Sequence, residues 1–152
     1  MARARDAPYL IALDSSCLVA LVCGWHEHQA ATASLVEHRL ERGARMAIAA
    51  PALVEAYAVL TRLPSPHRLA APDALELLRA NFEEATAVAL SAREYWALLL
   101  EAPPRVYGGR TYDAVIAACA QKAKVRELVT LNVRHFEGFA SDSLQIVSPI
   151  DA

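Results

Sequence analysis

Short apolar runs alternate with longer segments of helical periodicity along most of the chain, and this alternation is the strongest constraint on its fold. Each run has the length of a strand and is mostly continuous in apolar character, as expected of strands buried on both faces. The runs occupy residues 9–13, 46–50, 86–90, 127–131 and 144–148. The pattern therefore predicts an α/β domain with a central sheet of five mostly parallel strands flanked by helices.

The first two long intervals between these runs carry helix signals. Residues 25–43 have apolar side chains at helical spacing, and Gly43 supplies a stop. Pro51 can open the next helix, because a residue in the first turn has no intrahelical N–H bond to lose. Pro64 closes it, so that we expect a helix over residues 52–63.

Three further helices are indicated in the second half of the chain. Pro72 opens the first of them, and Ser91 with Glu94 has the spacing of a capping box at the start of the next. The last long helix is expected over residues 111–124. Its apolar stripe at helical spacing predicts that Tyr112 is buried, together with the other stripe residues Ile116, Cys119, Ala120 and Ala123.

Length and composition predict one globular domain over residues 1–152. The chain has 55% hydrophobic and 21% charged residues, and neither a linker nor a repeat divides it. These values exclude an intrinsically disordered chain. Fifteen Lys and Arg stand against 17 Asp and Glu, for a formal net charge of −2. The balance excludes the strongly basic surface of a non-specific nucleic-acid binder, although local basic patches remain possible.

The sequence predicts a cytoplasmic protein that does not enter a membrane. No apolar run approaches the about 18–20 uncharged residues of a membrane span, and the first 13 residues are too short for a secretory signal. The three cysteines, Cys17, Cys23 and Cys119, lie inside apolar runs without paired zinc spacing. We therefore expect reduced thiols in the core.

Four polar residues interrupt or follow the apolar segments at positions where burial would be costly without a reason. Asp14 directly follows the first predicted strand, and Asn132 follows the fourth. Glu55 lies early in the helix after the second strand, and Asp113 lies in the first turn of the last long helix. All four can reach the carboxyl edge of a parallel sheet, where such sheets bind ligands. Crowded carboxylates repel one another, and a divalent cation relieves the repulsion; oxygen ligands favour Mg²⁺ or Mn²⁺.

Each of these residues also has an ordinary structural interpretation. Asp14 can cap a helix, and Asp113 can complement the positive end of a helix. Glu55 can be a solvated helix residue, and Asn132 can belong to a turn. Only the joint arrangement of the four residues favours a shared site.

Four segments carry a resemblance to a known family. They are LIALDSSCLVAL around Asp14, PALVEAYAVLTRL around Glu55, YDAVIAACA around Asp113 and LVTLNVRHFEGF around Asn132. In order and spacing the chain resembles PIN domains over almost its whole length, and within that family it is similar to the VapC-type toxins of VapBC toxin–antitoxin pairs.

The resemblance implies a fold and an activity. The expected fold is a three-layer domain with a parallel sheet of strand order 3-2-1-4-5 flanked by helices. The expected activity is metal-dependent endoribonuclease cleavage at a Mg²⁺ or Mn²⁺ pocket. Asp14, Asp113 and Glu55 would bind the metal, Glu55 directly or through water, and Asn132 would complete the catalytic set. Many PIN nucleases have Asp at this last position, so the amide weakens the case for a second metal.

Hydroxyl and guanidinium groups near the acids are candidates for supporting roles. Ser15, Thr111 and Thr130 could hold the carboxylates or water, or could be only caps and strand-end bonds. Arg105, Arg110 and Arg134 could approach an RNA backbone, or could be surface charges without a partner. They come from the two loops that flank Asp113 and Asn132. His135 is interpreted as a packing or loop residue rather than a general base.

The implied partners are an RNA substrate, a cognate antitoxin protein and a second copy of the chain in a homodimer. A different class of function stays open: a PIN-like fold that binds RNA or protein without catalysis. Metal-dependent cleavage of RNA would discriminate between the two.

Overall fold

Five parallel strands form the central sheet of the protein. The computed structural model describes residues 7–102 and 104–151. The strands are β1 (Tyr9–Leu13), β2 (Ala44–Ala49), β3 (Thr86–Val88), β4 (Glu127–Val129) and β5 (Gln145–Val147). They pair in the order β3-β2-β1-β4-β5, and every pairing is parallel. This confirms the expected α/β class and strand order.

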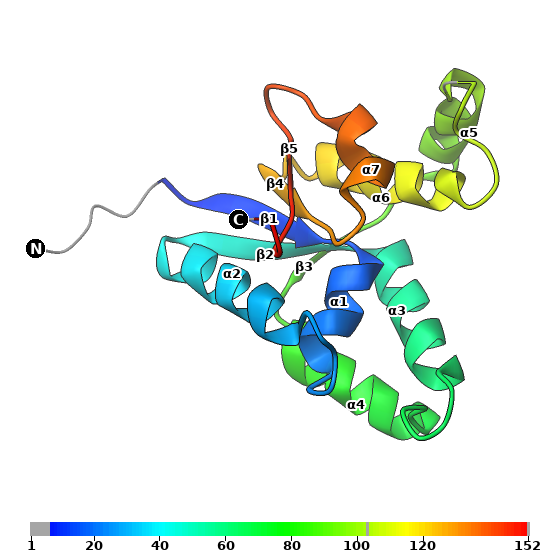
Figure 1. Ribbon diagram of the computed structural model, residues 1–152. Coiled ribbons are helices and arrows are strands. Elements are labelled where there is room, and N and C mark those ends of the chain that lie inside the picture. The colour runs from blue at the N-terminus through cyan, green and yellow to red at the C-terminus, as the bar shows by residue number, and fades with distance from the viewer. Residues whose placement is uncertain (1–6, 103, 152) are drawn as a thin grey trace, which may run out of the picture.

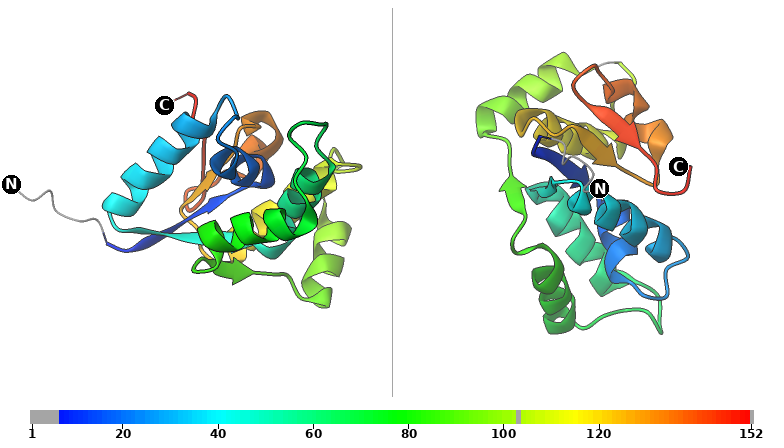
Figure 2. Two further views of the ribbon diagram at one scale, coloured as in Figure 1. Left: turned by 90° about the horizontal axis from the view of Figure 1, so that it is seen from below. Right: turned by 90° about the vertical axis from the view of Figure 1, so that its left-hand side faces the viewer.

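Helices cover both faces of the sheet. Those of the first half are α1 (Ser15–Val22), α2 (Gln29–Glu41), α3 (Ala50–Arg62) and α4 (Ala71–Phe82). The second half has α5 (Ala92–Glu101), α6 (Arg110–Lys122), the short α7 (Val133–Phe136) and a 3-10 helix at Glu137–Phe139. Figure 1 shows α1 to α4 on one side of the sheet and α5 to α7 on the other, and both views of Figure 2 agree. The result is the predicted three-layer arrangement.

Helix α1 was not predicted, and it is the most deeply placed helix of the first layer. Cys17, Leu18, Val19 and Ala20 are all buried in it. A helix that is apolar on every side has no amphipathic period, so its sequence resembles a buried run of any kind. Helix α1 packs against α2 and α3 as well as β1, which explains why no polar face is needed.

The local helix signals are confirmed where they were strongest. Ser91 Oγ accepts a hydrogen bond from the Glu94 backbone N–H, and the Ser91 N–H donates to Glu94 Oε2 at 2.6 Å. Pro51 and Pro72 lie in the first turns of α3 and α4. Gly43 has φ 99°, a backbone conformation that glycine adopts without strain, and it ends the turn after α2.

The predicted burial is wrong at the edge of the sheet. Strand β3 has only three residues, and Thr86 and Ala87 are exposed. An edge strand pairs on one side only, so it needs less apolar surface than the central strands. Strand β4 also ends two residues earlier than expected, and β5 ends one residue earlier.

Tyr112 is a second correction, because 69% of it is exposed. The buried stripe of α6 begins at Ala114 and continues through Ile116 and Cys119. Helix α6 packs on β2 and β3 and on α3, α5 and α7. Tyr112 lies in the first turn of α6, before the buried stripe begins, so helical spacing alone did not show that its neighbours leave this turn uncovered.

The three cysteines are free and buried, as predicted. Among the described residues, no helix has the length and apolar character that crossing a bilayer requires.

Candidate active site

Asp14 lies between the end of β1 and the start of α1, at the carboxyl edge of the sheet. Its N–H donates to the Val129 carbonyl at 3.0 Å, so the residue continues the pairing of β1 with β4. Its side chain caps α1, because Oδ1 accepts a hydrogen bond from the Cys17 N–H at 3.0 Å. Only 2% of the residue is exposed. Asp14 is therefore a helix cap and a buried carboxylate at the same time.

Two hydroxyl groups hold the Asp14 carboxylate. Ser16 Oγ donates to Oδ1 at 2.6 Å, and Thr130 Oγ1 donates to Oδ2 at 2.6 Å. The same hydroxyl oxygens accept backbone N–H groups, from Leu131 at 3.3 Å and from Asn132 at 2.9 Å. This network joins the end of β1 to the end of β4 and fixes the orientation of the acid.

The neighbouring hydroxyl predicted for this role, Ser15, is not the one that contacts Asp14. Ser15 is the first residue of α1, and the bond comes from Ser16. A serine two residues after a capping Asp lies in the first turn, where its hydroxyl can fold back onto the carboxylate. The spacing Asp14-x-Ser16 was therefore the signal that sequence reasoning missed.

Burial raises the pKa of the Asp14 carboxyl above its ordinary value, although the hydrogen bonds from Ser16, Thr130 and Cys17 lower it in part. Removing a carboxylate from water disfavours its charged form, and neutral donors offset only part of that cost. A positive charge nearby, such as that of a divalent cation, would favour the ionised form.

Asp113 lies in the first turn of α6 and shares the charge environment of Asp14. Burial raises its pKa, and the negative charges of Asp14 and Glu55 raise it further. His135 and Arg110 act in the opposite direction. Asp14 and Glu55 are thus each close enough to Asp113 to affect its ionisation, although the three acids come from elements that are far apart in the sequence.

His135 faces Asp113 across the site. Its Nδ1 lies 3.3 Å from Asp113 Oδ2. The sequence favoured a packing or loop histidine, but the ring is exposed and directed at an acid. The signal was its place three residues after Asn132, because a short helix turns such a residue back towards the sheet edge.

Glu55 and Asn132 line two different cavities. Glu55 is an exposed residue of α3 and lines a cavity of about 630 Å³ between α3, α5 and α6. Asn132 is the N-cap residue of α7, but its side chain makes no capping bond. It lines a second cavity, of about 300 Å³, together with Arg134 and His135.

The other predicted residues lie at different distances from the acids. Arg110, the first residue of α6, is exposed and its charge reaches Asp113. Arg134 is exposed in α7 on the Asn132 side, and Arg105 is exposed in the loop before α6. The Thr111 N–H donates to the Gly108 carbonyl at 3.1 Å, which is a role in the turn that begins α6.

The chemistry of the donors fits a hard divalent cation. Asp14, Asp113 and Glu55 offer carboxylate oxygens, the ligands that Mg²⁺ and Mn²⁺ prefer. Across residues 7–102 and 104–151, no three His, Cys, Asp or Glu side chains lie together in a group that could hold a metal ion. Mg²⁺ does not require a group of three, because it keeps several waters and is commonly held by one or two carboxylates.

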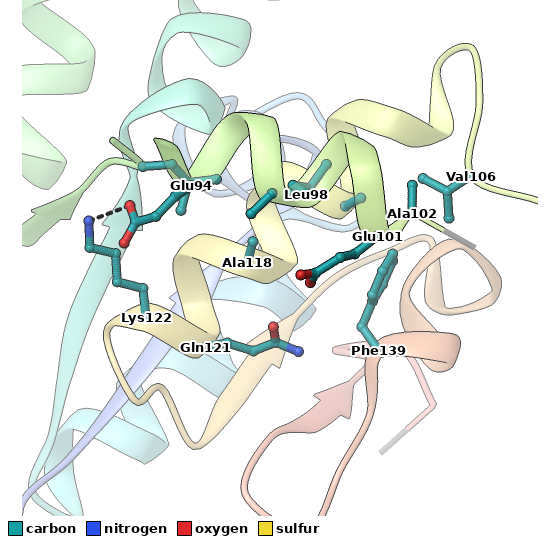
Figure 3. Close-up of a pocket in the computed structure, with 12 residues that line it drawn as sticks. Glu94, Leu98, Glu101, Ala102, Val106, Ala118, Gln121, Lys122 and Phe139 are labelled. Carbon is teal, nitrogen blue, oxygen red and sulfur yellow. Dashed lines mark hydrogen bonds and ion pairs between the residues drawn. The ribbon is translucent and has the colours of Figure 1, made fainter. Parts of the chain in front are cut away.

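A separate cavity of about 350 Å³ lies between α5 and α6, away from the acids (Figure 3). The ion pair between Glu94 and Lys122, at 2.8 Å, stands at one end of it, and Phe139 stands at the other. None of the four predicted catalytic residues lines it. The acidic edge of the sheet is therefore the candidate active site.

Two known ribonucleases are similar to this chain over most of its length. The chain is 41% identical over 132 residues to Ribonuclease VapC40 of Mycobacterium tuberculosis, covering 86% of this chain and 92% of that protein. It is 31% identical over 137 residues to Ribonuclease VapC27 of the same organism, covering 90% and 95%.

A solved structure shows the same fold at low identity. The M. tuberculosis toxin VapC20, which cleaves the sarcin-ricin loop, superimposes with a TM-score of 0.64 at 15% identity, over 84% of this chain and 94% of that one. The family model of the PIN domain matches residues 11–140. This chain belongs to the PIN-domain family.

Proposed function

We propose that this chain is a Mg²⁺- or Mn²⁺-dependent endoribonuclease and the toxin of a type II toxin–antitoxin pair. The observation that carries the proposal is the acidic centre, in which Asp113 interacts with Asp14 and Glu55 while Ser16 and Thr130 hold Asp14 in place. Two relatives that align over most of the chain are ribonucleases by name, which supports the same activity.

Asp14, Asp113 and Glu55 would hold the cation, with Glu55 acting directly or through water. A bound divalent ion supplies a Lewis acid that lowers the pKa of water and offsets charge on a phosphate. The protein needs no covalent nucleophile for such hydrolysis.

The chain's own residues would orient the reacting groups. Ser16 and Thr130 fix both oxygens of Asp14, so that this ligand needs little reorganisation. His135, with Nδ1 at 3.3 Å from Asp113 Oδ2, would form an ion pair when the ring is protonated, which keeps the acid ionised and turned towards the site. Asn132 would direct its amide towards the same edge.

Cations around the acidic centre would receive the RNA backbone. Arg110 and Arg134 come from α6 and α7, on either side of the acids, and Arg105 lies in the loop before α6. Guanidinium groups bind phosphate oxygens in a bidentate manner, which would compensate for the negative field of the carboxylates.

The antitoxin would cover an apolar groove between α3 and α4. The groove has a volume of about 250 Å³, and its walls are mainly Leu53, Val54, Tyr57, Leu75, Leu78 and Phe82. Val54 and Leu75 are exposed at 68% and 53%. A partner helix with apolar side chains fits such a groove, and an Arg of the partner could enter the acidic centre and replace the cation electrostatically.

Cleavage of a panel of structured RNAs, with and without EDTA, tests the enzymatic part. We expect cleavage that requires Mg²⁺ or Mn²⁺ and is abolished by Asp14→Asn. Asn is the appropriate change because Asp14 also caps α1 and Asn retains most of the capping. RNA binding without metal-dependent cleavage would instead support the non-catalytic alternative.

Co-purification with the product of a neighbouring reading frame tests the toxin part. We expect a short partner that inhibits cleavage and whose release restores it. A partner that inhibits equally well after its basic residues are replaced would contradict the entry of an Arg into the acidic centre.

A further inference from the structure

Tyr112 is exposed beside the acidic centre, where the sequence predicted a buried ring. It directly precedes Asp113 in the first turn of α6, and 69% of it is accessible. Exposure alone does not distinguish this ring, because Trp96 and Tyr107 are exposed to 68% and 74%. Tyr112 differs from them in its place next to Asp113 and in the cavity that Glu55 also lines.

The ring lines the cavity of about 630 Å³ that also reaches Glu55. Tyr95 of α5 lines the same cavity, so two aromatic side chains from neighbouring helices border one space. Glu55 and Arg62 of α3 supply its charged lining, and Ile116 belongs to its apolar lining. Figure 1 shows α3, α5 and α6, the helices that carry these residues. Two aromatic rings and one acid of the acidic centre, Glu55, thus line the same cavity.

The overall charge of the protein does not attract RNA, and the Arg residues around the acidic centre would act against this charge. The chain has a formal net charge of −2, and the proposed catalytic centre adds carboxylates where a phosphate would lie. Attraction between phosphates and a basic surface, which drives many nucleic-acid complexes, is weak in such a case. Stacking of bases on aromatic rings does not depend on net charge.

We propose that Tyr112 and this cavity receive one unstacked nucleobase of the RNA, next to the phosphate at the acidic centre. The inference rests on the proposed ribonuclease function and assigns its base subsite. Recognition of single-stranded RNA commonly places bases on aromatic side chains. Tyr112 provides the stacking face, and Tyr95 and Ile116 border the space that the base enters.

Binding of a fluorescein-labelled single-stranded RNA dodecamer of random sequence, measured by anisotropy, tests the proposal. All proteins carry Asp113→Asn to prevent cleavage. We expect Tyr112→Ala to weaken binding about tenfold, within the range found when a stacking aromatic residue is replaced. Tyr112→Phe keeps the ring and should stay within about twofold of the protein with Tyr112 intact.

A matched control and a second probe separate stacking from a structural effect. Trp96→Ala removes another exposed aromatic residue, 68% accessible on α5 but not part of the cavity, and should leave binding unchanged. A ribose-phosphate dodecamer without bases should bind equally to the protein with Tyr112 intact and to the Tyr112→Ala variant, because it has nothing to stack.

If the Tyr112→Ala variant binds base-containing RNA as tightly as the protein with Tyr112 intact, the proposal is overturned. It is also overturned if Tyr112→Ala weakens binding of the strand without bases as much as binding of RNA. A change of molar mass in light scattering on Tyr112→Ala would assign the cavity to an interface between copies instead. Cleavage is measured separately, with the unsubstituted protein. If that protein does not cleave RNA and its Asp113→Asn form does not bind RNA, the proposed function fails together with the inference. If the unsubstituted protein cleaves RNA and Tyr112→Ala leaves RNA binding unchanged, only the inference fails.

Discussion

Thr130 Oγ1 donates a 2.6 Å hydrogen bond to Asp14 Oδ2, across 116 positions of the sequence. Both residues are buried, and each follows one of two adjacent strands, β1 and β4. The bond therefore connects the central pair of the sheet at the point where the candidate catalytic acid is held. Fold stability and orientation of the site depend on the same contact.

Thr130→Val tests this connection. Valine has nearly the shape of threonine but cannot donate, so Asp14 Oδ2 loses its partner in a buried position. We expect the free energy of unfolding to fall by about 1–3 kcal/mol and RNA cleavage to decrease. Urea denaturation measures the first effect. Thr61→Val is the control, because Thr61 Oγ1 bonds only to carbonyls of its own helix and should change stability less.

Asp113→Asn tests the shared metal site. With Mg²⁺ or Mn²⁺ at about a hundred times the dissociation constant, the ion should stabilise the parent by about 2.7 kcal/mol, or roughly 5–10 °C in Tm. The variant should lose this shift and RNA cleavage together. Asp142→Asn, at an exposed acid in the turn before β5, should keep both. Full cleavage and a full shift in Asp113→Asn would refute a shared carboxylate site.

Without metal, the difference in stability between Asp113→Asn and the parent protein depends on pH. Because the folded-state pKa of Asp113 is raised, the folded protein binds this proton more tightly than the unfolded chain. Its contribution to stability is present below the ordinary value of 3.8 and is lost as the pH rises through the folded-state pKa. Asp113→Asn should match the parent at low pH and exceed its stability near neutrality. Urea titrations in EDTA measure the difference, and a constant difference would contradict the raised pKa.

His135→Ala tests the contact with Asp113. Protonated His135 lowers the pKa of Asp113, so its removal should raise that pKa. The acidic limb of the pH–rate profile for RNA cleavage should then move to higher pH, with a smaller rate at the optimum. His38→Ala, at an exposed histidine of α2, should leave the profile unchanged. A reduced rate with an unmoved limb would mean that His135 affects only local structure.

Asn132→Asp tests whether the side chain at position 132 lies within reach of the metal. Asp would add a hard anionic ligand and should tighten binding of Mg²⁺ or Mn²⁺, as measured by titration calorimetry. Asn81→Asp adds the same charge at an exposed position of α4 and should leave the affinity unchanged. Equal affinities in all three proteins would place Asn132 outside the reach of the metal, as the N-cap residue of a short helix only.

Much of the fold could be predicted from local patterns. The strand at Tyr9–Leu13, the capping box at Ser91 and the stop at Gly43 depend on neighbouring residues, so the sequence contains the whole signal. Helix α1 was not predicted because its sequence has no amphipathic pattern. Its burial depends on the helices and the strand that pack against it. The exposure of Tyr112 likewise depends on which turns of α6 the neighbouring elements cover.

The sequence by itself determined which acids interrupt the apolar segments, and parallel strands bring those positions to one edge of the sheet. Only the tertiary structure decided that Ser16 rather than Ser15 contacts Asp14 and that His135 faces Asp113. A difference of one position along a helix rotates a side chain by about 100°, since 3.6 residues make a turn. Hydrogen bonds tolerate only a few tenths of an ångström, so these contacts depend on the packed helices and not on the residue types alone.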